Sequence, residues 1–139
     1  MLKRTVVMLT IALVVGMAVG LIGHQLLIAQ PQPVQRAALL KTELAGIEGK
    51  EAVVLKVEAA PGAVSGKHYH PGHELAYILE GTMILEVEGK PPVTLKAGDT
   101  FHMPPQVVHG GKNASTTAPL KVLVFGLFEK GQPDTTPVQ

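Results

Sequence analysis

The stretch GAVSGKHYHPGHELAYILEG, residues 62–81, holds three histidines and a glutamate within positions 68–74. His68 and His70 are two residues apart, so on a β-strand both imidazoles project from the same face. Glu74 follows the turn signal Pro71-Gly72, and such a turn can return its carboxylate to the same point. This spacing makes the three side chains candidate ligands of one metal ion.

A fourth candidate ligand, His109, lies at least a hairpin further along the chain, and a barrel could bring it alongside. Three imidazoles and one carboxylate suit Fe(II), Mn(II), Ni(II), Cu(II) or Zn(II), and ligand softness does not separate these ions. Two neighbouring histidines are interpreted differently. His73 is expected as an exposed turn residue, with a substrate contact or a contact behind the ligands as alternatives, and His102 as a strand histidine with its own partner.

Outward from this stretch, apolar residues alternate with polar ones at a period of two, which is typical of strands. Turn signals rich in Pro and Gly separate the runs. The sequence therefore predicts an all-β antiparallel sandwich or barrel. Residues 37–44 fit either a lead-in strand or a short helical turn. The strands are expected at 52–58, 67–70, 76–79, 82–88, 93–95, 100–103, 107–109 and 120–128.

Two spaced motifs in this region resemble those of the cupin superfamily. The first pairs H-x-H with a later glutamate between two glycines, and the second combines a glycine, a proline, a histidine and an asparagine. The sole departure is Gln106, where the family usually has glycine. The matching positions are Gly62, His68, His70, Glu74 and Gly81 for the first motif, and Gly98, Pro104, His109 and Asn113 for the second.

The resemblance implies a small cupin-type antiparallel β-barrel, also called a double-stranded β-helix or jelly roll, over residues 36–130. It also implies that His68, His70, Glu74 and His109 bind one divalent transition metal. Apolar residues would line or underlie the barrel, and Tyr77 is expected in its core, with a position facing the cavity as the alternative. The barrel-lining residues would be Met83, Leu85, Phe101, Met103 and Val107.

The cupin family is functionally broad, so the resemblance does not select one activity. One reading is a metal-dependent small-molecule enzyme such as a dioxygenase-like oxidoreductase, in which Glu74 acts as a catalytic base or leaves the metal. The alternative is a non-catalytic, metal-stabilised protein that binds a small molecule or a sugar. A third reading is a metal-dependent partner in an envelope complex. Small members of the family commonly pair through their sheets, so a homodimer is also expected.

The N-terminal segment, residues 1–30, has the pattern of an export signal. Lys3 and Arg4 precede the uncharged run 6–23, and a positive start before an apolar run is typical of a signal peptide. The run is long enough for an uncleaved signal anchor to be the alternative, and in that case it would be the only contact with a membrane. Both readings predict that residues 36–130 lie outside the cytoplasm, in the periplasm if the source is bacterial.

The composition of the chain restricts the classes of partner that it can bind. Ten basic and eleven acidic residues follow position 30, and no basic patch stands out, which disfavours nucleic-acid binding. The chain has no cysteine, so disulfides and thiolate metal sites are excluded. A small-molecule ligand or substrate is the expected partner. Residues 131–139 contain two prolines and little apolar surface, so they are expected to form a disordered tail.

Overall fold

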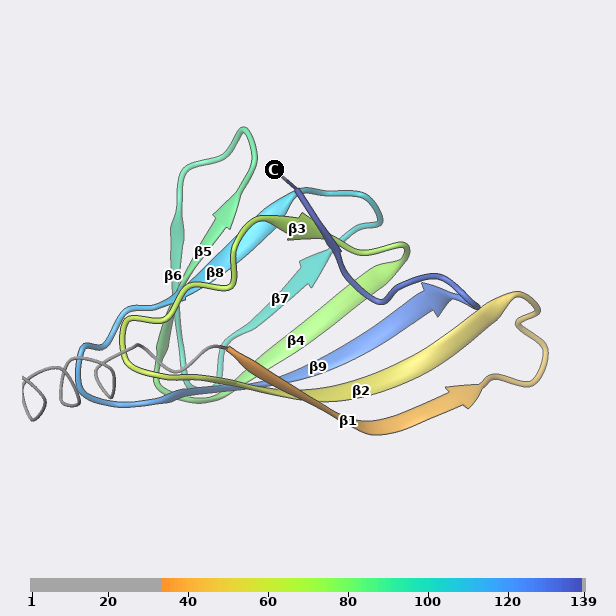
Figure 1. Cartoon of the computed structure of the whole chain (residues 1–139), viewed down its shortest axis with the longest axis horizontal. Coiled ribbons are helices and arrows are strands. Elements are labelled where there is room, and N and C mark those ends of the chain that lie inside the picture. The colour runs from red at the N-terminus through yellow and green to blue at the C-terminus, as the bar shows by residue number, and fades with distance from the viewer. Residues whose placement is uncertain (1–33, 139) are drawn as a thin grey trace, which may run out of the picture. The chain divides into compact units, whose positions relative to one another are not determined.

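A computed structural model of the chain describes residues 34–138, and the export signal predicted at 1–30 lies outside this range. Between residues 34 and 138, no helix is long and apolar enough to cross a bilayer. Ten strands follow one another in this range (Figure 1): β1 (Gln35–Glu43), β2 (Lys50–Ala59), β3 (His68–Tyr69), β4 (His73–Glu80), β5 (Thr82–Val87), β6 (Val93–Lys96), β7 (Thr100–Met103), β8 (His109–Asn113), β9 (Leu120–Glu129) and β10 (Thr136–Pro137).

The strands form two five-stranded sheets with antiparallel pairing throughout. One sheet has the order β1-β2-β9-β4-β7, and the other has the order β10-β3-β8-β5-β6. Strands distant in sequence are therefore neighbours, as where β2 pairs with β9 along its whole length. This confirms the predicted all-β antiparallel fold, and of residues 37–44 all but the last lie in β1 rather than in a helical turn.

The core consists of alternate residues of both sheets. In β9 every second residue is buried, as the period of two predicts, and β2 follows the same pattern except at Val57, which is partly buried. Ile78 in β4 and Phe128 in β9 are fully buried. From the other sheet, Met83 and Leu85 of β5 join the same apolar cluster. The predicted inward positions of β2, β5 and β9 are thus the ones that pack together.

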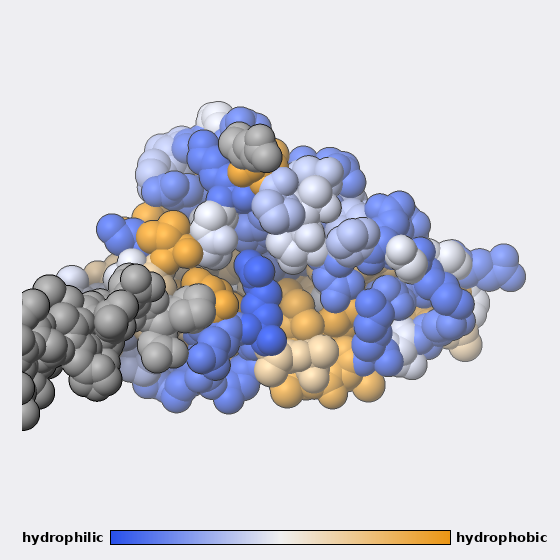
Figure 2. All heavy atoms as spheres, viewed as in Figure 1, coloured by the Kyte–Doolittle hydropathy of each residue, from blue (hydrophilic) through white to orange (hydrophobic). Residues whose placement is uncertain are grey.

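The outer face of the β1-β2-β9-β4-β7 sheet is also rich in apolar side chains. Phe125 of β9 lies opposite Leu75 of β4, and both are about half exposed. Leu39 and Leu40 of β1 are exposed as well, and Figure 2 shows apolar atoms at the edge where β1 runs in Figure 1. The prediction for Tyr77 is wrong. It lies on this outer face and is 42% exposed, because Glu74, Ala76 and Ile78 occupy the inward positions of the same strand.

The C-terminal segment differs from the disordered tail that its composition predicts. Thr136 pairs with Tyr69 and Pro137 with His68, so β10 extends the second sheet beside β3. The Val138 amide donates a further hydrogen bond of 3.0 Å to the Lys67 carbonyl. Composition alone could not reveal this pairing, because the partner strand is far away in sequence.

Candidate metal centre

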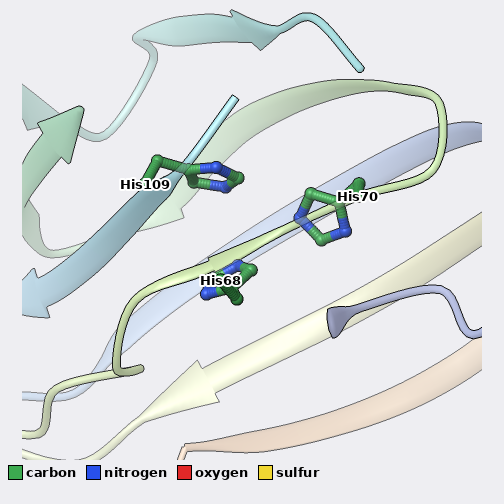
Figure 3. Close-up of side chains that lie close together, drawn as sticks. All are labelled: His68, His70 and His109. Atoms are coloured by element: carbon green, nitrogen blue, oxygen red, sulfur yellow. The ribbon is translucent and has the colours of Figure 1, made fainter. Parts of the chain in front are cut away.

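Pairing between β3 and β8 brings three histidines together. His68 lies directly opposite His109 in the antiparallel register, and His70 follows β3 on the same face as His68. In Figure 3 the three side chains lie around a common space between these strands. One ring nitrogen from each histidine lies within 4.8 Å of the other two, and all three residues are buried.

Glu74 reaches the same point from the opposite sheet. Its Oε2 lies 3.2 Å from His70 Nε2 and 3.1 Å from His109 Nε2. The chain crosses between the sheets at Pro71-Gly72, where a Cβ on Gly72 would lie 2.0 Å from the Leu127 carbonyl oxygen. Only glycine allows this close approach, so the turn fixes where β4 begins and where Glu74 points.

Backbone carbonyls orient all three imidazoles. His68 Nδ1 lies 3.0 Å from the Gly66 carbonyl oxygen, and His109 Nδ1 lies 2.9 Å from that of Val107. His70 Nδ1 lies 2.5 Å from the carbonyl oxygen of Asp134. A carbonyl only accepts hydrogen bonds, so each Nδ1 carries the proton and donates it. Each neutral ring then presents the lone pair of Nε2, the arrangement found in histidines that bind metals.

The donor atoms fit a divalent cation. Within residues 34–138, His70 Nε2 and Glu74 Oε2 are buried and have no hydrogen-bond partner. A buried polar atom without a partner is costly, and a cation placed among these lone pairs removes that cost. Three imidazole nitrogens and a carboxylate oxygen suit the first-row divalent metals. The cluster is therefore compatible with one metal ion, and its chemistry leaves the identity of the ion open.

The charge states of two residues match this role. Burial lowers the pKa of His68 to about 4, although its hydrogen bond to the Gly66 carbonyl opposes the shift. In the metal-free chain, burial alone would raise the pKa of Glu74, but protons on the facing nitrogens of the neighbouring imidazoles outweigh it and lower the pKa to about 2. Burial alone would lower the pKa of His70, but the contact with Glu74 outweighs it and raises this pKa. A bound metal would replace these protons. At neutral pH, His68 is thus uncharged and Glu74 is ionised, which are the forms that bind a metal.

His70 is held from several sides. Its ring stacks on the fully buried Phe128, with ring centroids 5.4 Å apart and an interplanar angle of 10°. Its carbonyl accepts a 3.0 Å hydrogen bond from the amide of Gln106. Gln106 has a φ of 63°, so this non-glycine residue adopts the left-handed conformation at the position where the second motif usually has glycine. The departure in sequence is therefore accommodated by the backbone.

A mostly apolar cavity of about 70 Å³ adjoins the four candidate ligands. Leu55, Val57 and Val124 are among its wall residues. Besides the four ligands and Asn113, its polar lining residues are Arg36, Ser65 and Thr135. The cavity is thus a small apolar space with the histidine cluster in its wall and few other polar groups.

The other two histidines of this region lie outside the cluster. His73 and His102 are exposed on the outer face of the first sheet, in β4 and β7. They contact each other, with His73 Nδ1 2.9 Å from His102 Nε2 and stacked rings. His73 is exposed as predicted, but it lies at the start of a strand, and the partner of His102 is His73.

Sequence reasoning missed two contributions to the site. The Asp134 carbonyl holds the His70 ring, and Arg36 and Thr135 line the cavity. The sequence around these residues gives no signal of their role. A backbone carbonyl is independent of residue type, and the segments that hold Arg36 and Thr135 reach the site only through long-range strand pairing. The structure brings all four predicted ligands together, and that they bind a metal remains a prediction.

Comparison with known proteins agrees with this architecture. The cupin domain family matches residues 55–126 of the chain. The chain is also similar to 3-hydroxyanthranilate 3,4-dioxygenase from Xanthomonas euvesicatoria pv. vesicatoria, with 30% identity over 69 residues. This match covers 48% of the chain and 39% of the relative, so the chain spans well under half of that enzyme's length.

Solved structures share the fold at low sequence identity. A protein with a double-stranded β-helix domain from Klebsiella pneumoniae has a TM-score of 0.61 and 22% identity, covering 79% of this chain and 90% of that one. A cupin-like protein from Thermotoga maritima has a TM-score of 0.61 and 27% identity, covering 76% and 75%. DMSP lyase DddQ from Ruegeria pomeroyi has a TM-score of 0.62 and 21% identity, and the match covers 76% of this chain and 51% of that one. With the family match spanning more than half of its residues, the chain belongs to the cupin family.

Proposed function

We propose that this chain is an exported, metal-dependent enzyme that acts on a small molecule, with a dioxygenase-like oxidoreductase as the specific candidate. The observation that carries the proposal is the convergence of four donor groups beside a cavity. Four protein ligands leave one or two positions open on a five- or six-coordinate ion, where a substrate or dioxygen can bind. The similarity to a dioxygenase supports this reaction class.

The residues of this chain have distinct tasks in the proposed enzyme. His68, His70 and His109 would hold the ion, with their rings fixed by backbone carbonyls. The ion would supply Lewis acidity and a binding position for the reactants. Glu74 is buried between two of the imidazoles, and a carboxylate with a pKa of about 2 is a weak base, so it could accept a proton from a substrate only after moving away from these rings. The apolar walls would limit the contact of water with the reacting groups.

A second function is favoured by the scarcity of polar groups in the cavity. Among residues 34–138, only Arg36, Ser65 and Thr135 add polar side chains to its lining besides the candidate ligands and Asn113. A protein that binds a small molecule or a sugar, with the metal stabilising the barrel, needs no further catalytic group. The two functions differ in what the carboxylate of Glu74 does.

The first experiment combines metal analysis with oxygen uptake. The full chain is purified without a histidine tag, analysed for bound metals, and then loaded in turn with Fe(II), Mn(II), Ni(II), Cu(II) and Zn(II). Oxygen consumption is measured with 3-hydroxyanthranilate and other compact aromatic acids as trial substrates. We expect uptake that requires one of the redox-active metals. Absence of uptake with every metal and substrate would favour the binding protein.

The second experiment separates the enzyme from the binding protein through Glu74→Gln, compared at equal metal occupancy. This change keeps the shape of the side chain and removes its charge and basic oxygen. If Glu74 transfers a proton, turnover per bound metal falls by about 100-fold or more while the substrate still binds. Equal turnover per metal would exclude a proton-transfer role. In the binding protein, ligand binding instead falls in step with metal occupancy.

Export is the remaining part of the proposal and rests on the sequence pattern of residues 1–30. A fusion of residues 1–35 to a reporter that is active only after export tests it. We expect an active reporter, and an inactive reporter that remains in the cytoplasm would contradict the proposal.

A further inference from the structure

Arg36 contributes a cationic side chain to the cavity that adjoins the histidine cluster. It lies in β1 opposite Val57 of β2, and both residues line this cavity. Its neighbour Ala37 pairs with Lys56 and belongs to the other face of the sheet, since successive side chains alternate. Arg36 is an exposed residue, so it belongs to the solvent-facing part of the lining that it shares with the candidate metal ligands.

The guanidinium of Arg36 has no hydrogen-bond or ion-pair partner among residues 34–138. The acidic side chains of neighbouring strands are engaged elsewhere: Glu58 pairs with Lys56, and both Glu51 and Asp134 pair with Lys41. Among the described residues, Arg36 is thus a cation without a partner that shares the lining of one cavity with the four candidate ligands.

The charges lining the cavity do not balance. Glu74 is the one acidic side chain among its described lining residues, and its carboxylate faces His70 and His109. Arg36 and a divalent ion would together add three positive charges to that single negative one. This surplus favours an anion, although solvent screens the part of the attraction that comes from the exposed Arg36. A planar guanidinium presents paired N–H donors that match the two oxygens of a carboxylate.

We propose that Arg36 binds the carboxylate of the ligand, and that the substrate class is therefore a compact organic acid with an apolar body. The cavity of about 70 Å³ is open to solvent, so it receives only part of the ligand, and walls such as Leu55 and Val124 suit an apolar body. The hydroxyl groups of Ser65 and Thr135 also line this space. This inference rests on the proposed function, since it names the substrate class of the same site.

The test compares a carboxylate with its uncharged amide. The full chain, kept in a neutral detergent and loaded with Zn(II), is titrated with benzoate and with benzamide by calorimetry. Zinc is redox-inert, so binding is measured apart from any oxygen chemistry. The variants are Arg36→Gln and Arg36→Lys, and the control is Lys56→Gln, which removes a positive charge from the opposite face of the sheet. Thermal unfolding of each variant verifies that it is folded.

We expect wild-type protein to bind benzoate about tenfold or more tightly than benzamide, as a charge-assisted pair predicts. Arg36→Gln loses this preference, Arg36→Lys retains part of it, and Lys56→Gln leaves it unchanged. Three results would each overturn the inference: no benzoate binding by wild type, equal binding of benzoate and benzamide, or unchanged benzoate affinity in Arg36→Gln.

The same titration in chelator-treated protein separates this inference from the proposed function. The guanidinium contact does not require the ion, so the benzoate preference and its loss in Arg36→Gln persist, although overall affinity is weaker. Failure of the chain to take up any metal would count against the proposed function alone. Normal metal uptake without an effect of Arg36→Gln would count against the inference alone.

Discussion

Deleting residues 131–139 removes the hydrogen-bond acceptor of His70 while leaving all four candidate ligands in the chain. In the full chain, His70 Nδ1 donates to the Asp134 carbonyl at 2.5 Å, and β10 fixes that carbonyl by pairing with β3. Without this segment the His70 ring loses the contact that determines which nitrogen carries the proton. We therefore expect the truncated chain to fold and to bind metal more weakly.

The size of the effect follows from the type of contact that is lost. Loss of a partner that orients a metal ligand typically costs about 10–100-fold in metal affinity. This range corresponds to about 1.4–2.7 kcal/mol of binding free energy. Stacking on Phe128 still restrains the ring, which favours the lower half of the range. Competition with a chelator of known zinc affinity gives the dissociation constants of the full and truncated chains.

Asp134→Ala provides the matched control for this truncation. It removes the side-chain ion pair with Lys41 but keeps the backbone carbonyl that accepts from His70. We expect its metal affinity to stay within about threefold of wild type, because exposed ion pairs contribute little. If the truncated chain, verified as folded, binds zinc as tightly as the full chain, the segment does not orient His70 and the reasoning fails.

Two further predictions concern stability. Asn113 is buried; its amide nitrogen donates to the carbonyls of Ala59 and Ala118, and its Oδ1 accepts from the Ser115 amide. We expect Asn113→Ala to lower the free energy of unfolding by about 2–4 kcal/mol, measured by denaturant titration. A loss under about 0.5 kcal/mol would be inconsistent with these hydrogen bonds. In metal-free protein, contacts with His109 and His70 hold the pKa of Glu74 near 2, below its ordinary 4.5, so the stability from its ionised form is present above pH 4.5 and lost as the pH falls toward 2. Glu74→Gln should flatten this part of the pH profile of unfolding, and an unchanged profile would argue against the shift.

Local sequence patterns predicted those parts of the molecule that depend on near neighbours. Alternation in β2, β5 and β9 identified their buried faces, and the spacing from His68 to Glu74 identified ligands that the structure brings together. The outward position of Tyr77 could have been predicted from the alternation of side chains along its strand. Once Glu74 is assigned to the inner face, a residue three positions later on the same strand must face outward.

The parts that the sequence did not reveal depend on contacts between distant segments. The tail beyond residue 130 is ordered through its pairing with β3, and neither strand has a pattern that specifies the other. Arg36 becomes a cavity residue only because β1 pairs with β2 in a register that places it opposite Val57. Such pairings depend on the assembled sheets, so composition and motif spacing carry no information about them.

The central claim, that the histidine cluster binds one divalent metal, is tested most directly by counting metal per chain. Wild type, His70→Ala and the control His102→Ala are stripped with chelator, reloaded with zinc, passed over a desalting column and analysed by elemental mass spectrometry. His102 is exposed on the outer face and lies outside the cluster. We predict one zinc per chain in wild type and His102→Ala, and a marked loss in folded His70→Ala. Full occupancy in His70→Ala, or no zinc in wild type, would contradict the claim.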